Sequence, residues 1–71
     1  MSSEIQSIYF MEPMWNTSKA SRWLKITGHI PIKRVHRNGH ELRYRMTDPD
    51  QYKYFRTKKL SDGIYFVLGF K

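Results

Sequence analysis

The chain contains no cysteine and only three histidines among its 71 residues. Disulfide bonds are therefore excluded, and a structural zinc site is not expected, because such sites depend largely on thiolate ligands. The absence of cysteine fits a reducing, intracellular environment. The histidines, His29, His36 and His40, stand apart without acidic neighbours at ligand spacing, so we expect exposed side chains and neither a metal nor a cofactor.

Long apolar stretches are missing as well. No run approaches the roughly 18 apolar residues that cross a membrane, and no apolar segment of signal-peptide length follows Met1. We therefore expect a soluble protein without membrane contact. The whole chain, residues 1–71, is expected to form one compact domain, in which only about 60% of the unfolded chain's surface is buried. Aromatic residues make up 15% of the chain, and they suit so small a core because each buries a large area.

Acidic residues are scarce, with six Asp and Glu against 13 Lys and Arg and a formal net charge of +7. The excess is concentrated between Lys33 and Arg45, where Glu41 is the single acid. Clustered Lys and Arg bind polyanions well, because each neutralised phosphate releases counterions. The composition therefore predicts a polyanion partner, and the partner we expect is nucleic acid, DNA more than RNA.

The first part of the chain predicts a strand followed by a helix. Residues 5–11 include four consecutive apolar side chains, typical of a buried strand, and Pro13 would end it. A helix is expected over residues 17–27, with its cap within residues 16–18 and Gly28 as the left-handed residue at its end. Its apolar stripe follows the helical period: Ala20, Trp23, Leu24 and Thr27.

A hairpin is predicted after Pro31. It joins residues 32–37 to residues 40–47 through Asn38-Gly39, a strong signal for a tight turn. Successive side chains of the second strand point to opposite faces of the sheet. These are Leu42, Tyr44 and Met46 on the inner face, and Glu41, Arg43 and Arg45 on the outer face.

A short helical turn and a second hairpin follow. Residues 48–50 predict a helical turn that runs through Tyr52, and residues 54–60 predict a strand with Arg56 and Lys58 on one face and Lys59 on the other. Residues 64–70 are apolar on both faces, so we expect the best-buried strand there, in the middle of the sheet or under a partner subunit. The fold class is therefore α+β: one main helix packed on a small antiparallel sheet, in the order β-α-β-β-short helix-β-β.

From Trp15 onward the spacing of certain residues resembles a known domain. The residues concerned are Trp15, Ala20, Trp23-Leu24, Gly28, Arg43-Tyr44-Arg45, Asp48-Pro49, Tyr52, residues 56–60, Gly63-Ile64 and Gly69. The pattern is similar to a small domain, without an established activity, that recurs in tailed-phage and large-DNA-virus genomes. The resemblance implies a viral or mobile-element origin. We expect the protein inside the cell, in the virion or in the host cytoplasm or nucleus. The similar domains carry more acids in the helix and turn, so the strong basic balance is particular to this chain.

An enzymatic function is not expected, since the sequence shows no oriented base beside a serine, no evident carboxylate pair and no glycine-rich phosphate loop. We predict instead that a basic sheet face binds the nucleic-acid backbone with little sequence readout, because no base-reading helix is recognisable. The expected binding residues are Lys33, Arg34, Arg37, Arg43, Arg45, Arg56, Lys58 and Lys59. All of them except Lys33 and Arg56 are expected to form one continuous patch.

Other interpretations remain open. Arg43 and Arg45 could simply solvate the sheet or pair with Asp48 and Asp50, and the chain would then be a virion or assembly protein that self-associates or docks to an acidic partner. A homodimer is expected because the apolar area of Tyr9-Phe10 and residues 64–70 looks generous for one helix to cover, although the N-terminal strand could complete that layer instead. Five tyrosines could stack on bases, although core packing explains most of them. They are Tyr9, Tyr44, Tyr52, Tyr54 and Tyr65.

Overall fold

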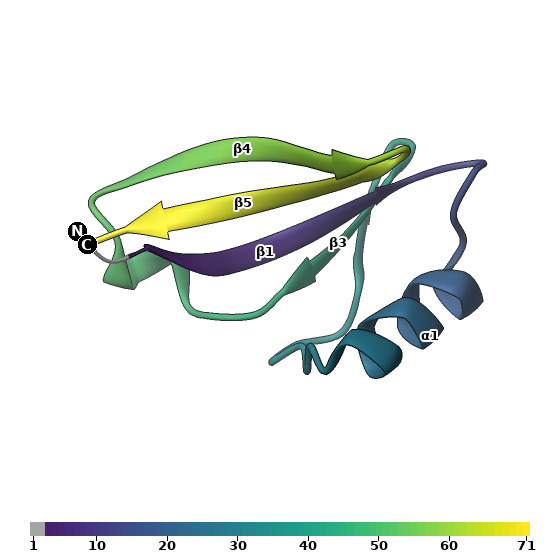
Figure 1. Ribbon diagram of the computed structural model, residues 1–71, viewed down its shortest axis with the longest axis horizontal. Coiled ribbons are helices and arrows are strands. Elements are labelled where there is room, and N and C mark those ends of the chain that lie inside the picture. Colours follow the sequence, from purple (N-terminus) through teal and green to yellow (C-terminus); the bar gives the residue numbers. More distant parts are fainter. Residues whose placement is uncertain (1–2) are drawn as a thin grey trace.

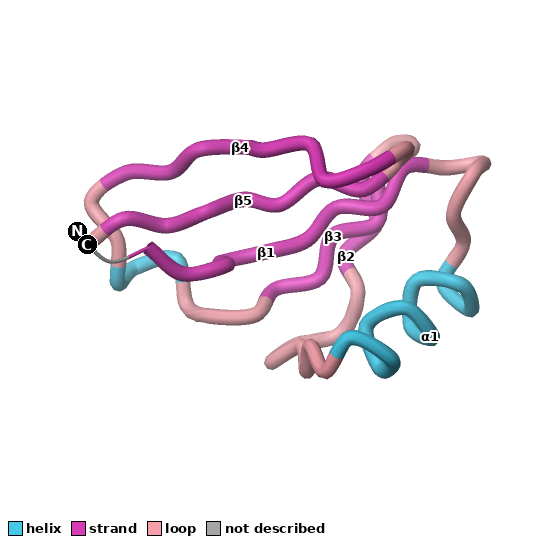
Figure 2. Tube along the Cα trace, in the orientation of Figure 1, coloured by secondary structure: helices cyan, strands magenta, loops and turns pink. Residues whose placement is uncertain are grey.

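A computed structural model describes residues 3–71 of the chain. One helix lies against a five-stranded antiparallel sheet with the strand order β2-β3-β1-β5-β4 (Figure 1, Figure 2). The strands are β1 Ser3–Met11, β2 His36–Asn38, β3 Glu41–Arg45, β4 Tyr54–Ser61 and β5 Ile64–Phe70, and the helices are α1 Thr17–Thr27 and the short 3-10 turn η1 Pro49–Gln51. The predicted α+β class and the predicted order of elements are confirmed.

The helix α1 begins and ends where its local sequence indicates. The Asn16 Oδ1 accepts a hydrogen bond of 2.8 Å from the backbone N–H of Lys19, which satisfies one of the amides that a helix leaves unpaired at its start. At the other end Gly28 has a φ of 80°, and the N–H of His29 donates to the carbonyl oxygen of Leu24 at 2.8 Å. The predicted helix boundaries and both predicted caps are confirmed.

Aromatic rings hold α1 against one side of the sheet. Phe10 on β1 is fully buried, and its ring centroid lies 5.1 Å from that of Trp15 and 5.7 Å from that of Trp23. Ala20 and Leu24 of the helix are buried in the same cluster. Tilted and edge-to-face ring contacts of this kind add to the stability that burial alone provides. The two tryptophans therefore pack the helix on the sheet.

β1, and not β5, is the best-buried strand, which corrects the expectation for residues 64–70. β5 does lie inside the sheet, between β1 and β4, as predicted. However, β4 is an edge strand whose residues are all exposed, and Phe66 and Leu68 of β5 are only half-buried. β1 lies between β3 and β5, where Ile8 and Phe10 are fully buried.

The first hairpin is shorter than predicted. β2 begins only at His36, and residues 32–35 form a loop. This loop carries the chain from the end of α1 to the edge of the sheet, and it is tied to β3 where the Ile32 N–H donates to the Arg45 carbonyl oxygen at 2.9 Å. The tight turn also shifts by one residue, to Gly39-His40, where Gly39 has a φ of 63°.

The predicted short helical turn folds back over one end of the sheet. Asp48 caps η1, since its Oδ1 accepts a hydrogen bond of 3.0 Å from the backbone N–H of Asp50. Tyr52 follows, and its ring lies so close to Gly69 of β5 that a Cβ added there would come within 2.5 Å of the Tyr52 Cγ. The Tyr52 hydroxyl is hydrogen-bonded to Thr47 Oγ1 at 2.6 Å. This end of the sheet is therefore closed by a packed ring.

Candidate nucleic-acid interface

The sheet has two unlike faces. Leu42 and Tyr44 of β3 are buried in the cluster that includes the helix residues, so the alternating side chains of Arg43 and Arg45 lie on the other side of the sheet. The predicted outward direction of these arginines is confirmed. We call this side, opposite α1, the open face, because α1 is the single α-helix among residues 3–71.

One line of side chains crosses the whole open face. Backbone pairing places Arg43 beside Tyr9 and Tyr9 beside Tyr65. Tyr65 in turn pairs with Lys59 on β4, and His36 on β2 pairs with Arg43. We call this line, in the order His36, Arg43, Tyr9, Tyr65 and Lys59, the cross-sheet row. It spans four gaps between neighbouring strands, roughly 19 Å in all.

Arg43 is held in place within the cross-sheet row. Its guanidinium carbon lies 5.2 Å from the centroid of the Tyr9 ring, a cation–π contact. One of its terminal nitrogens, Nη2, lies 3.4 Å from Gln6 Oε1. Gln6 is fully buried, and its own amide nitrogen donates to the Thr47 carbonyl oxygen at 2.9 Å. Arg43 is thus positioned by a buried side chain, and its charge lies over the centre of the sheet.

Arg45 lies one row further along β3, where it pairs with Ser7 of β1. Together with Lys33 it lines a hollow of about 290 Å³ that also includes Asp48 and Asp50. No ion pair within 4.0 Å joins Arg45 to either aspartate among residues 3–71. The two carboxylates nevertheless lower the positive potential beside Arg45.

A shallow hollow of about 360 Å³ lies beside the tyrosines of the cross-sheet row. Its lining residues are Tyr9, Met11, Glu41, Thr57 and Tyr65. Both tyrosines are half-buried, while Thr57 on the edge strand β4 is exposed. The hollow therefore combines ring surface with hydroxyl groups and one carboxylate, in the part of the open face that lies away from the Tyr52 ring.

The six residues expected to form one continuous patch are divided between the two sides of the sheet and a loop, which corrects that expectation. Arg37 pairs with Leu42 and Lys58 pairs with Phe66, whose side chains face α1, so these cations lie on the helix side. The open face holds Arg43, Arg45 and Lys59, the helix side holds Arg37, Arg56 and Lys58, and the loop before β2 holds Lys33 and Arg34. Strand alternation separates neighbours such as Lys58 and Lys59 because each step along a strand reverses the face.

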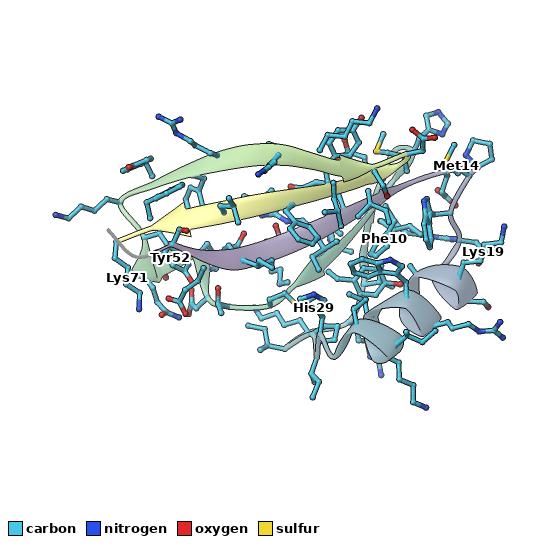
Figure 3. All side chains as sticks on the ribbon, viewed as in Figure 1. Phe10, Met14, Lys19, His29, Tyr52 and Lys71 are labelled. Atoms are coloured by element: carbon cyan, nitrogen blue, oxygen red, sulfur yellow. The ribbon has the colours of Figure 1, made fainter. Side chains whose placement is uncertain are left out.

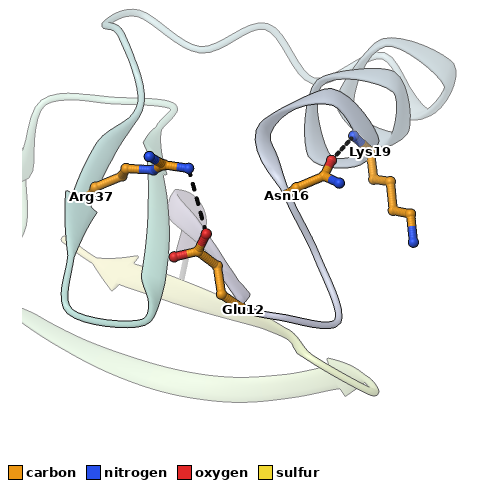
Figure 4. Close-up of polar contacts among 4 residues, drawn as sticks. All are labelled: Glu12, Asn16, Lys19 and Arg37. Carbon is orange, nitrogen blue, oxygen red and sulfur yellow. Dashed lines mark hydrogen bonds and ion pairs between the residues drawn. The ribbon is translucent and has the colours of Figure 1, made fainter.

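Three of the six acids are already paired with cations. Arg37 Nη2 lies 3.5 Å from Glu12 Oε2 (Figure 4), and Lys59 Nζ lies 4.0 Å from an oxygen of Asp62. At the opposite end of the sheet, near Tyr52 (Figure 3), Lys71 Nζ lies 2.9 Å from Glu4 Oε1. The hydrogen bond to Glu4, together with its negative charge, raises the pKa of Lys71 above 10.5. Exposed pairs of this kind stabilise a fold only weakly.

The structure reduces the five tyrosines proposed as base stackers to two. Tyr44 and Tyr52 are buried, and Tyr54 lies on the helix side, stacked on Phe70 at 4.8 Å. Tyr9 and Tyr65 remain, side by side on the two central strands of the open face. Sequence reasoning missed that they are neighbours, and it missed His36 as a member of the same row. The sequence did indicate the face of each tyrosine, because each stands between two apolar residues that are expected to face the core, as in Ile64-Tyr65-Phe66.

No group of His, Asp or Glu within residues 3–71 is arranged to hold a metal ion, and no helix in that range is long and apolar enough to cross a membrane. Comparisons of the chain with protein-family models, with curated proteins and with solved structures found no match.

Proposed function

We propose that the chain is a non-enzymatic nucleic-acid-binding protein whose open face contacts the phosphate backbone with little sequence specificity. The observation that carries the proposal is the cross-sheet row, in which Arg43 and Lys59 lie on either side of Tyr9 and Tyr65. The expectation of DNA in preference to RNA comes from the sequence and is part of the proposal.

The spacing of the cations suits a polymer of phosphates. Arg43 and Lys59 are separated by three inter-strand gaps, about 14 Å, so they reach different phosphates of one strand. Arg45 lies two residues from Arg43 on β3, about 7 Å away. Guanidinium groups bind phosphate oxygens in a two-pronged geometry, and each contact that replaces a counterion favours association.

Little sequence readout is expected from this arrangement. Specific readout of duplex DNA usually requires a helix or a two-stranded ribbon that enters the major groove. Here α1 lies behind the sheet, on the side opposite Arg43 and Tyr9. Cations on a flat sheet position a backbone but do not distinguish base pairs.

A pair of double variants tests the proposal in a mobility assay at two salt concentrations. Arg43→Ala with Arg45→Ala removes two cations from the open face, and Arg56→Ala with Lys58→Ala removes two from the helix side. We expect the open-face variant to bind more weakly and the slope of log affinity against log salt to fall by about two units. The helix-side variant should bind like the parent. If both variants weaken binding equally, binding depends on the total positive charge of the protein and not on the open face, and the proposal would be wrong.

A second candidate function, docking to another protein, is favoured by an apolar strip on the helix side. Phe66, Leu68 and Phe70 of β5 are half-buried, and Tyr54 beside Phe70 is 41% exposed. Cations lie along the β4 border of the strip, Arg56 beside Leu68 and Lys58 beside Phe66. An acidic protein surface complements this border, whereas a second copy would bring the same cations to the interface.

Sedimentation at micromolar concentration and two salt concentrations tests this second candidate. A single species of about 8.6 kDa under both conditions would exclude self-association through the strip, and an acidic protein would then be the expected partner. A dimer that strengthens as salt rises would identify a second copy as the occupant, because salt screens the repulsion between the bordering cations. Loss of that dimer in Leu68→Glu would locate the interface on the strip.

A further inference from the structure

From the order of side chains in the cross-sheet row we infer that the ligand is a single strand, with one unpaired base stacked on Tyr65 in the adjoining hollow. This inference depends on the proposed nucleic-acid binding and adds to it the form of the polymer. A row made only of cations would serve a duplex equally well, but this row has two rings between its cations.

The two rings are not equivalent. The Tyr9 ring is occupied by the guanidinium of Arg43, 5.2 Å from its centroid. The Tyr65 ring has no ring or cation contact within residues 3–71, although it is only half-buried. Tyr9 therefore fixes Arg43, while Tyr65 offers a ring on which a base can stack. Aromatic side chains on a sheet surface are a common platform for unpaired bases.

The hollow beside Tyr65 suits a single ring system. Its volume of about 360 Å³ lies at the lower end of the range for small-molecule pockets. A base inside a duplex has both ring faces covered by its neighbours, so only an unpaired base can stack on Tyr65. A duplex resting on the cations would leave the hollow empty.

Glu41 makes the hollow unfavourable for a phosphate group, so the hollow is left for the base. It lines the hollow together with Tyr65, and its carboxylate repels a phosphate group. The cations of the row lie on the two sides of the tyrosine pair, Arg43 next to Tyr9 and Lys59 next to Tyr65. A strand that follows the row thus places phosphates at Arg43 and Lys59 and turns a base toward the hollow. Glu41 also offers an acceptor for an exocyclic amino group of that base.

The test compares a thymine oligonucleotide of about twelve residues, within the range of single-module sites, with a duplex of equal length. The parent should bind the single strand more tightly than the duplex. Tyr65→Leu should weaken single-strand binding about 5- to 100-fold and leave the salt slope unchanged, because no phosphate contact is lost. Tyr65→Phe, which keeps the ring, should bind like the parent. Tyr54→Leu is the matched control, since Tyr54 lies on the helix side.

A second variant tests the same hollow in case Tyr65→Leu fails to fold. Thr57 is exposed on the edge strand, so Thr57→Leu fills part of the hollow without touching the core, and it should weaken single-strand binding in particular. If parent and variants bind the single strand and the duplex alike, the stacking inference is wrong while the backbone proposal stands. If the parent binds neither polymer at low salt, the proposed function itself is wrong.

Discussion

On the side of α1 the ring of Phe10 touches other rings, whereas in the middle of the open face Tyr9 touches a cation and Tyr65 touches no ring among the described residues. Phe10 contacts Trp15 and Trp23 on the helix side. The next residue back along β1, Tyr9, contacts Arg43 on the open face. Adjacent aromatic residues of one strand thus have different partners, rings for Phe10 and a cation for Tyr9, because neighbours along a strand face opposite ways.

The largest expected effect compares these two neighbours on β1. Phe10→Ala should lower the free energy of unfolding by about 3–5 kcal/mol, because a fully buried ring is replaced by a cavity. Tyr9→Ala should cost only about 1 kcal/mol, the range of a cross-strand pair and a cation–π contact at a half-exposed site. Urea denaturation followed by tryptophan fluorescence measures both. Comparable losses would show that the open face also supports the fold.

A smaller effect is expected at the closed end of the open face. Gly69→Ala should lower the free energy of unfolding by about 1–3 kcal/mol, because the new Cβ would lie within 2.5 Å of the Tyr52 ring and force it to move. Gly39→Ala serves as the control: its Cβ meets nothing within 4 Å, so its cost reflects only the positive φ of 63°. If Gly69→Ala melts like the parent, the Tyr52 ring does not close this end.

The helix cap should contribute less. Asn16→Ala removes the acceptor for the Lys19 N–H and should cost about 1 kcal/mol. Asn16→Asp keeps a side-chain oxygen and places a negative charge at the helix start, so its stability should match or exceed that of the parent. Thermal unfolding by circular dichroism compares the three proteins. Nucleic-acid binding should not change in either variant, since α1 lies away from the open face.

The smallest expected effect concerns pH. The pKa of Lys71 is raised above 10.5 by Glu4, so this lysine favours the folded state at lower pH, and the contribution is lost as pH rises through the raised pKa. Glu4→Gln should return the pKa of Lys71 toward its usual value, which NMR titration of the side chain can follow. Stability near neutral pH should change little, because the lysine is exposed to solvent. A large loss at neutral pH would contradict this.

The sequence by itself determined the elements whose signals are local. The helix Thr17–Thr27 was predicted with its approximate bounds because its caps and its apolar stripe lie within or next to it. The facing of Arg43 and the turn beginning at Pro49 were predicted for the same reason, since alternation and capping need only near neighbours in the chain. The loop at residues 32–35 was missed because its path depends on where α1 ends relative to the edge of the sheet.

Only the tertiary structure decided which residues meet. The strand order places Tyr9 of β1 between Arg43 of β3 and Tyr65 of β5, although these residues are far apart in the sequence. No local pattern carries the register between distant strands, because that register depends on how all the strands together bury their apolar sides against α1. Alternation along residues 54–60 already predicted Lys58 and Lys59 on opposite faces, and the pairing of β4 with β5 confirms it, so the expectation of one continuous patch that contained both was wrong. The sequence therefore indicated which kinds of residue the candidate site contains, whereas strand pairing decided which of them lie side by side.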